Sequence, residues 1–201
     1  MSRGSEFIRR IEEALAAATD SGSDQPLTEL LEKEGFVYPA RSAANLQLLQ
    51  GTLSDRMVAE LAYASLATPL PDMALNGLER VGGVADRQEL IAVCGRKERR
   101  AQLLMLCGSS PFLVNVLCRD PAFFHQLFVT RAIDIRRSEQ EMLATLRSQA
   151  KGVDYADLFP VLRRFKFQEI LRIAARDLNG LAPLEEVTAE LSALAAATLQ
   201  V

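Results

Sequence analysis

The residues most able to do chemistry in this chain are two arginines and a glutamate that share one side of a predicted helix. When residues 155–179 are placed on a helix at 100° per residue, Glu169, Arg172 and Arg176 fall within a stripe about 60° wide. Apolar residues occupy much of the remaining circumference, which predicts a helix buried on several sides. A partly buried guanidinium needs a carboxylate or phosphate partner. Two interpretations follow: Glu169 pairs with both arginines, or the arginines face a nucleotide or a phosphorylated tyrosine.

Histidine and cysteine offer little further chemistry. The single histidine, His125, lies in the aromatic run 123–128, and one histidine cannot supply a two-histidine metal site or a catalytic dyad, so we expect it to pack in the core. The three cysteines, Cys94, Cys107 and Cys118, form no Cys-x-x-Cys pair and have apolar neighbours. Burial raises a thiol pKa, so inert core thiols in a reducing cytosol are expected.

Sequence patterns that hold phosphates or metal ions are also absent. The turns at Gly82-Gly83 and Cys107-Gly108 lack the rest of a phosphate-binding loop. No Asp-x-Asp pair, which two-metal nucleotidyl transfer uses, occurs anywhere in the 201 residues. We therefore expect no metal site and no catalytic residue within this chain.

Composition favours a soluble helical protein. Apolar residues make up 49% of the chain, Trp is absent and the net charge is -3, so there is no global attraction to nucleic acid or to anionic membranes. No run of about 18 apolar residues could cross a bilayer, and a cytoplasmic location is expected. The mixed-sign segments 96–100 and 136–137 are predicted to be solvated helix faces. A nucleic-acid-binding regulator that uses residues 96–100 or 163–166 is the competing hypothesis.

The elements that must position these residues are helices. The sequence predicts an all-α fold, a bundle of about ten helices without a sheet, with proline near the start of the helices that follow Gln25, Ser110, Asp120 and Ala182. The predicted helices span 5–18, 26–34, 41–50, 54–67, 71–80, 86–106, 110–118, 121–129, 134–150, 155–179 and 183–199. A single domain over residues 1–201 is preferred, and a subdivision into 1–83 and 84–201 is the alternative. No internal repeat of fixed period is found.

The last predicted helix carries the clearest apolar stripe. Its members recur at steps of three and four, a spacing that places them on one side of a helix. They are Leu184, Val187, Leu191, Leu194 and Thr198. This side is expected to pack against another helix.

Several segments resemble one enzyme family. The first group lies on the two predicted carboxy-terminal helices: Arg163-Arg164-Phe165, Glu169, Leu171-Arg172-Ile173-Ala174, Arg176-Asp177, Leu184-Glu185-Glu186-Val187 and Leu191-Ser192-Ala193-Leu194-Ala195. The second group comprises Pro71-Asp72, Leu75, Glu79-Arg80, Ser109-Ser110-Pro111-Phe112-Leu113 and Arg119-Asp120-Pro121. In order and spacing these resemble the bifunctional glutamine synthetase adenylyltransferase/adenylyl-removing enzymes, over residues 40–199. The sequence departs from the family at residues 166–168, where a denser arginine run is usual.

The resemblance implies an amino-terminal, helical portion of a longer nucleotidyltransferase that controls nitrogen metabolism. Such enzymes attach AMP from ATP to a tyrosine of glutamine synthetase and remove it again, which implies glutamine synthetase and the PII signalling protein as partners, and Mg and ATP as cofactors of the whole enzyme. Within this chain, Arg163, Arg164, Glu169, Arg172 and Arg176 become candidates for supporting the active site. The chain alone is expected to be inactive, and a stand-alone helical protein-interaction module is the alternative.

Overall fold

Helices account for all the regular secondary structure in residues 3–201, which are the residues that the computed structural model describes. This range contains twelve α-helices, one π-helical turn and one 3-10 turn, and no strand, which confirms the all-α prediction. The contacts between residues divide the chain into two compact units, one up to Pro121 and one from Ala122 onward. We call them the first and second units.

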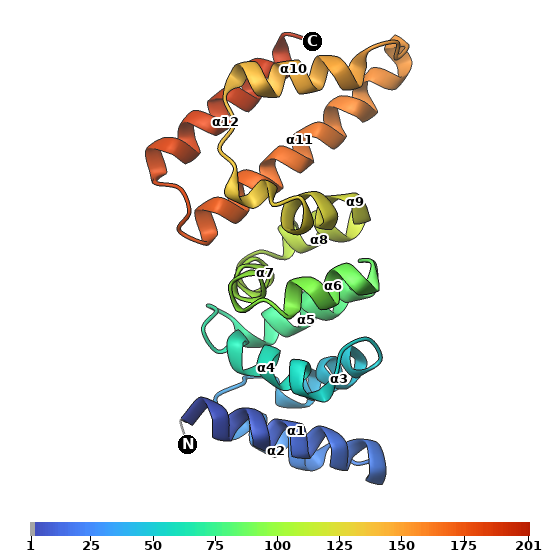
Figure 1. Cartoon of the computed structure of the whole chain (residues 1–201), viewed down its shortest axis with the longest axis vertical. Coiled ribbons are helices and arrows are strands. Elements are labelled where there is room, and N and C mark those ends of the chain that lie inside the picture. The colour runs from blue at the N-terminus through green and yellow to red at the C-terminus, as the bar shows by residue number, and fades with distance from the viewer. Residues whose placement is uncertain (1–2) are drawn as a thin grey trace. The chain divides into compact units, whose positions relative to one another are not determined.

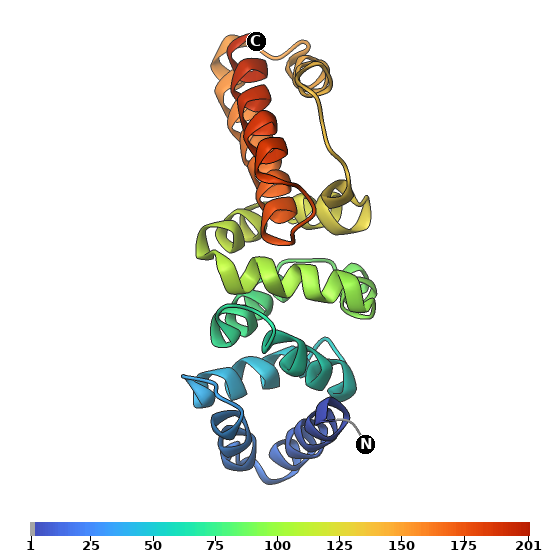
Figure 2. The same cartoon turned by 90° about the vertical axis from the view of Figure 1, so that its left-hand side faces the viewer.

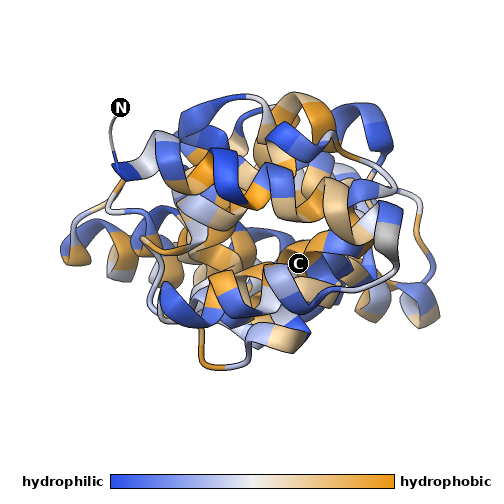
Figure 3. Cartoon of the chain, turned by 90° about the horizontal axis from the view of Figure 1, so that it is seen from below, coloured by the Kyte–Doolittle hydropathy of each residue, from blue (hydrophilic) through white to orange (hydrophobic). Residues whose placement is uncertain are grey.

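The first unit contains eight α-helices that pack mainly on their neighbours (Figures 1 and 2). They are α1 (Arg3–Ser21), α2 (Gln25–Lys33), α3 (Pro39–Gln50), α4 (Asp55–Ser65), α5 (Pro71–Gly82), α6 (Arg87–Cys94), α7 (Lys97–Ser109) and α8 (Pro111–Arg119). Helix α1 packs against α2 and α4, α3 packs against α2 and α5, and α5 packs against α7 and α8. Polar and apolar residues alternate along the helices, as expected when each helix buries only one side (Figure 3).

The helices α3, α5 and α8 each begin with proline, and similar contacts join them. Arg41 of α3 donates from Nη2 to Asn76 Oδ1 of α5 at 2.9 Å. Arg80 of α5 donates from Nη2 to Asn115 Oδ1 of α8 at 2.8 Å. The sequence analysis found no repeat because the starting prolines are not evenly spaced, although the packing between these helices recurs.

One predicted helix of the first unit is in fact two. The sequence predicted a single helix over 86–106, which is wrong: α6 ends at Cys94 and α7 begins at Lys97. Arg96 between them has an extended backbone, with φ -97° and ψ 115°, so the chain turns after Gly95. Gly95 itself keeps a right-handed helical backbone, with φ -69° and ψ -20°, so the helix is broken at Arg96.

The second unit is built on three long helices and a short irregular region. It contains α9 (Pro121–Phe124) from its second residue onward, the π-helical turn η1 (His125–Val129) and the 3-10 turn η2 (Ala132–Asp134), followed by α10 (Glu139–Ala150), α11 (Tyr155–Leu178) and α12 (Leu184–Leu199). Helix α12 packs against both α10 and α11. The core of this unit consists of Met142, Leu146, Phe165, Ile173, Val187, Leu194 and Ala197.

The prediction of a helix over 134–150 is wrong in its first part. The chain is not helical between Ile135 and Ser138, and α10 begins at Glu139. Ser138 and Glu141 form a capping box: Ser138 Oγ accepts from the Glu141 backbone N–H at 3.3 Å, and Glu141 Oε2 accepts from the Ser138 N–H at 2.7 Å. The hydrogen bonds that the Ser138 backbone N–H and hydroxyl donate to the Glu141 carboxylate lower the pKa of Glu141 below its usual value. The Ser-x-x-Glu spacing is a known start signal that the sequence analysis did not use.

The boundary between the units differs from the subdivision proposed from sequence. The sequence analysis placed that alternative boundary between residues 83 and 84, whereas the units meet between Pro121 and Ala122. Helices α5 and α7, which lie on either side of residue 83, are packed closely together. A division there would separate helices that share one core.

The apolar stripe predicted on the last helix is only partly buried. Val187 and Leu194 are buried as expected, but Leu184 and Leu191 are exposed. Glu190 takes the buried place between Val187 and Leu194. The prediction failed because it assigned burial by hydropathy alone and did not consider a buried carboxylate.

The described helices include none that is, by itself, both long enough and apolar enough to span a membrane. Helices α7 and α8 meet the length and composition criteria only as a pair, with a bend of 115° between them.

Candidate functional site

Six charged side chains meet in the interior of the second unit. Three are arginines and three are glutamates, and we call them the Arg–Glu cluster. Its members are Arg137, Glu169, Arg172, Arg176, Glu186 and Glu190. They come from the segment before α10, from α11 and from α12, so the cluster joins three parts of the unit that are distant in sequence.

Glu169 binds two arginines at the centre of this cluster. Its side chain is only 1% exposed. Arg172, one turn later on α11, donates from Nε to Glu169 Oε2 at 2.8 Å. Arg137 donates from Nη1 to the other carboxylate oxygen, Oε1. Both oxygens of this buried carboxylate therefore have charged donors, as a buried charge requires.

Helix α12 supplies the other two carboxylates. Arg172 Nη2 lies 2.6 Å from Glu190 Oε1, and Arg176 Nε lies 3.4 Å from Glu190 Oε2. These two contacts are ion pairs without the alignment of a hydrogen bond. Arg176 also donates from Nη2 to Glu186. Because Glu186 and Glu190 are one turn apart, the two carboxylates match the spacing of Arg172 and Arg176 on the neighbouring helix.

The cluster also holds the irregular segment that leads into α10. Arg172 donates from Nη1 to the carbonyl oxygen of Ile135 at 2.7 Å, and Arg176 donates from Nη1 to that of Ile133 at 3.2 Å. In the opposite direction, the backbone N–H of Arg137 donates to Glu190 Oε1 at 2.8 Å. Backbone groups outside regular structure need such partners when buried. The cluster thus replaces the hydrogen bonds that this segment would make in a helix.

The charges within the cluster balance. Its three arginines face three glutamates, and Glu169, Arg172 and Glu190 are almost completely buried. An anionic ligand at Arg172 would have to displace a carboxylate already bound there. This arrangement favours a role in positioning the surrounding backbone over direct binding of a phosphate group.

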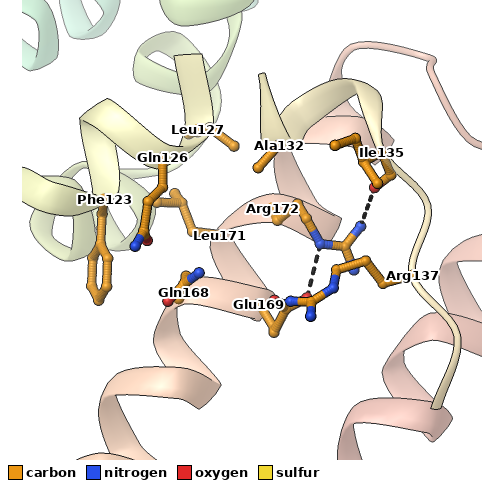
Figure 4. A pocket seen from close by; sticks show the side chains of 10 residues that line it. All are labelled: Phe123, Gln126, Leu127, Ala132, Ile135, Arg137, Gln168, Glu169, Leu171 and Arg172. Atoms are coloured by element: carbon orange, nitrogen blue, oxygen red, sulfur yellow. Dashed lines mark hydrogen bonds and ion pairs between the residues drawn. The ribbon is translucent and has the colours of Figure 1, made fainter. Parts of the chain in front are cut away.

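A cavity of about 200 Å³ lies beside the cluster (Figure 4). Arg137, Glu169 and Arg172 form its charged side, and two glutamine side chains and five apolar residues complete the wall. The remaining lining residues are Phe123, Gln126, Leu127, Ala132, Ile135, Gln168 and Leu171. All of them belong to the second unit.

The structure brings together three of the five residues proposed from sequence. Glu169, Arg172 and Arg176 are buried members of the cluster, whereas Arg163 and Arg164 are exposed on α11. Arg164 lies over the Phe123 ring, 5.6 Å from its centroid. Of the two sequence interpretations, pairing with Glu169 is correct for Arg172. For Arg176 it is wrong, because α12 supplies closer carboxylates.

Three members of the cluster, Arg137, Glu186 and Glu190, were not predicted from sequence as site residues. Arg137 was placed on a solvated helix face, but its side chain is only 19% exposed and binds Glu169. A usable signal was present for the two glutamates. Arg176 and Glu186 lie equally far before and after Leu181, and so do Arg172 and Glu190. Two antiparallel helices joined by a short turn place such residues opposite each other.

The other basic segment, residues 96–100, is also less exposed than predicted. Arg99 is buried, and Arg100 donates from Nη1 to Glu60 Oε2 at 2.5 Å. The prediction of a solvated face is therefore wrong for these two arginines. Arg99 is withdrawn from the surface, and the Arg100 side chain is only 12% exposed.

Two of the three thiols, those of Cys94 and Cys107, lie in the core as predicted, whereas Cys118 is only partly buried and the histidine is exposed. Burial raises the pKa of Cys94 to about 12, and it raises the pKa of Cys107 and Cys118 as well. These thiols are therefore poor nucleophiles near neutral pH. His125, which was expected to pack in the core, is exposed at the start of η1. The π-helical turn directs its neighbours Phe124 and Leu127 inward instead.

Within residues 3–201, no group of three or more His, Cys, Asp and Glu side chains is arranged to hold a metal ion. The acidic residues of the Arg–Glu cluster are bound to arginines. These three carboxylates therefore do not fit a site for Mg²⁺.

Comparisons with known proteins point to one family. The family model described as glutamate-ammonia ligase adenylyltransferase matches residues 100–201. A relative from Streptomyces coelicolor is 35% identical over 180 residues, which cover 86% of this chain and 17% of the relative. One from Pseudomonas syringae pv. tomato is 29% identical over 167 residues, which cover 79% of this chain and 17% of the relative. Both are named bifunctional glutamine synthetase adenylyltransferase/adenylyl-removing enzyme.

A third relative of that name, from Nitrosomonas eutropha, is 50% identical over 64 residues, which cover 31% of this chain and 7% of the relative. The chain thus spans about one sixth of the length of the first two curated relatives. No solved structure matches it. The family match includes the whole second unit and every member of the Arg–Glu cluster, and the chain belongs to the glutamate-ammonia ligase adenylyltransferase family.

Proposed function

We propose that this chain is a helical portion of an enzyme that attaches AMP to glutamine synthetase and removes it again, and so regulates nitrogen metabolism. The observation that carries the proposal is the family match over residues 100–201, which contains all six members of the Arg–Glu cluster. The names of the relatives supply the two reactions and the protein substrate.

Within such an enzyme, the Arg–Glu cluster would act as a brace for the active site. Arg172 and Arg176 each bind carboxylates and a backbone carbonyl oxygen of the segment that precedes α10. Because their charges are matched by glutamates, they are positioning residues in this proposal and do not contact the substrate. Arg163 and Arg164 are exposed, and they remain candidates for direct contact with a partner or a phosphate.

The partners and cofactors of the proposal follow the family. Glutamine synthetase is the substrate, the PII signalling protein is a regulator, and the enzyme works in the cytoplasm. Mg²⁺ and ATP serve the adenylylation reaction. Two-metal catalysis needs clustered carboxylates, and residues 3–201 contain no group of three or more His, Cys, Asp and Glu side chains that could hold a metal ion. The 201-residue chain alone is therefore expected not to transfer AMP.

The proposal is tested with the complete gene product that contains these 201 residues. Wild-type protein should adenylylate glutamine synthetase with ATP and Mg²⁺, and should deadenylylate the modified form. In the family that the chain resembles, this helical portion precedes the half of the enzyme that removes AMP. We therefore expect Arg172→Ala to reduce deadenylylation at least tenfold more than adenylylation. Incorporation and release of labelled AMP measure both rates.

Arg147→Ala is the matched control, because Arg147 is exposed on α10 and lies outside the cluster. It should leave both rates unchanged. Equal loss of both activities in Arg172→Ala, at an unchanged unfolding midpoint, would contradict the bracing role. Absence of both activities from the complete wild-type protein would overturn the proposed function itself.

A further inference from the structure

We propose that the cavity beside the Arg–Glu cluster binds a small uncharged molecule that carries a hydrogen-bond donor, such as a carboxamide or a hydroxyl group, on a compact apolar body. Figure 4 shows the two glutamine side chains on the side of the cavity opposite Ile135 and Arg137. The proposal concerns a ligand of the second unit and does not depend on the transfer of AMP.

Two buried acceptors in the cavity wall have no partner. The side-chain oxygens of Gln126 and Gln168 are buried, and neither accepts a hydrogen bond. Both residues line the cavity. A buried polar atom without a partner is unfavourable, and such atoms are rare in folded proteins. A ligand N–H or O–H group inside the cavity would satisfy them.

The charged side of the cavity excludes an anionic ligand. Arg137 and Arg172 reach the wall, but both are bound to Glu169, and Arg172 also lies against Glu190. A phosphate or carboxylate group of a ligand that approached these arginines would be repelled by the carboxylates of Glu169 and Glu190. A volume of about 200 Å³ is also below the roughly 300–1,000 Å³ of pockets for drug-sized ligands, so a nucleotide would not fit. The ligand is therefore small and neutral.

The rest of the wall is apolar. Phe123, Leu127 and Leu171 are buried, and Ala132 and Ile135 complete the lining. Pockets that combine an apolar wall with a few fixed polar groups bind ligands of matching polarity. The apolar residues would surround the body of the ligand while the glutamines fix its donor group.

The backbone at the cavity is unusual in two places. Residues 125–129 form a π-helical turn, which carries Gln126 and Leu127 into the wall. Such turns occur often at functional sites. Arg131, directly after it, has a left-handed backbone with φ 63°, and its Nε donates to Asp134 Oδ2 at 2.9 Å. Both features are less favourable than a regular helix, and they shape the cavity.

The experiment uses the whole 201-residue chain and three probes of similar size. Isobutyramide offers an N–H donor, isobutanol an O–H donor, and isobutyrate is an anion without a donor. We expect the amide and the alcohol to bind with dissociation constants in the millimolar range, and isobutyrate to bind at least tenfold more weakly. Shifts of the backbone amide signals of Leu127 and Ile135 in two-dimensional NMR report binding at the cavity itself.

Two variants make the test specific. Gln168→Met keeps the volume but removes the acceptor, and it should weaken isobutyramide at least tenfold. Gln149→Met, on the exposed side of α10, should leave binding unchanged. If Gln168→Met does not fold, Gln126→Met takes its place. No shift with either neutral probe would mean that water alone fills the cavity, and would overturn the proposal. The proposal would also be overturned if isobutyrate bound as tightly as isobutyramide, or if Gln168→Met bound isobutyramide as tightly as the wild-type protein.

Discussion

The two units bury their helices by different means. In the first unit the interior consists mostly of apolar side chains such as Leu61, Leu75 and Leu103, and the helices approach closely at Gly77 and Gly108. Most of its ion pairs, for example Arg9 with Glu13, lie at the surface, although the pair of Arg100 with Glu60 is partly buried. In the second unit, six charges occupy an interface that leucine or alanine would otherwise fill.

This difference shows what a buried ionic cluster can add to an apolar core. Apolar burial is not directional, so it tolerates small shifts of one helix along another. The pairs of Arg172 and Arg176 with Glu190 and Glu186 match in only one register of α11 against α12. The same arginines also bind the carbonyl groups of an irregular segment, which an apolar side chain could not do. We infer that the second unit uses charge to fix one backbone arrangement.

The largest expected effect comes from removing one charge of the cluster. Glu190→Gln keeps the shape of the side chain but leaves Arg172 and Arg176 with too few negative partners. Breaking a buried ion pair on one side typically costs about 3–5 kcal/mol, and we expect a loss of this size in the free energy of unfolding. Urea titration followed by circular dichroism measures it, and the transition assigned to the second unit should move.

Glu185→Gln is the control, because Glu185 is exposed one residue before Glu186. It should leave the urea midpoint nearly unchanged. A loss below about 1 kcal/mol in the free energy of unfolding of Glu190→Gln would indicate that water reaches the cluster. The charges of the second unit would then behave like the surface ion pairs of the first unit.

A smaller effect is expected where the first unit is most tightly packed. A Cβ at Gly108 would lie 2.8 Å from both Cβ and Oγ1 of Thr68 and 3.2 Å from Ala74 Cβ. Thr68 cannot move away easily, because its Oγ1 donates to the Ser65 carbonyl oxygen at 2.6 Å. Overpacking costs about 1–3 kcal/mol, and alanine recovers about 1 kcal/mol through helix propensity. Gly108→Ala should therefore lower the free energy of unfolding by up to about 2 kcal/mol in the same titration.

Gly83→Ala tests whether the effect is steric. Gly83 follows α5 with a right-handed helical backbone, and a Cβ there would meet no atom closer than 3.5 Å. This variant should be neutral or slightly stabilising. If Gly108→Ala also left the free energy of unfolding unchanged, close helix packing would not be a feature that sets the first unit apart from the second.

Much of the fold could be predicted from local sequence signals. Proline at the start of α8 and glycine after α11 mark helix ends through backbone geometry that does not depend on the rest of the protein. The failures arose where local signals compete. Gly95 was included in a single long predicted helix, although α6 ends just before it. The segment from Ile135 to Ser138 was predicted to be helical, but its hydrogen-bond partners lie on α11 and α12, which local sequence does not reveal.

The candidate site was predicted only in part for the same reason. Glu169 and Arg172 lie one turn apart, so helical periodicity was enough to pair them. Glu190 is contributed by another helix, and its burial cannot be read from α12 alone. The cavity depends on a π-helical turn, for which the sequence offers no simple rule. Predicting it requires the packing of α9, η1 and α11 together.

The smallest expected effect separates two neighbouring arginines. Arg136 is 64% exposed and lies 3.8 Å from Glu186, whereas Arg137 binds Glu169 in the interior. Arg136→Ala should change the free energy of unfolding by no more than about 0.5 kcal/mol, because an exposed pair is screened by water. Arg137→Ala should destabilise several times more in the same urea titration. Similar losses of unfolding free energy in the two variants would show that a charge near the cluster stabilises the protein whether or not its side chain is buried. The second unit would then differ from the first in its overall charge distribution and not in its buried ion pairs.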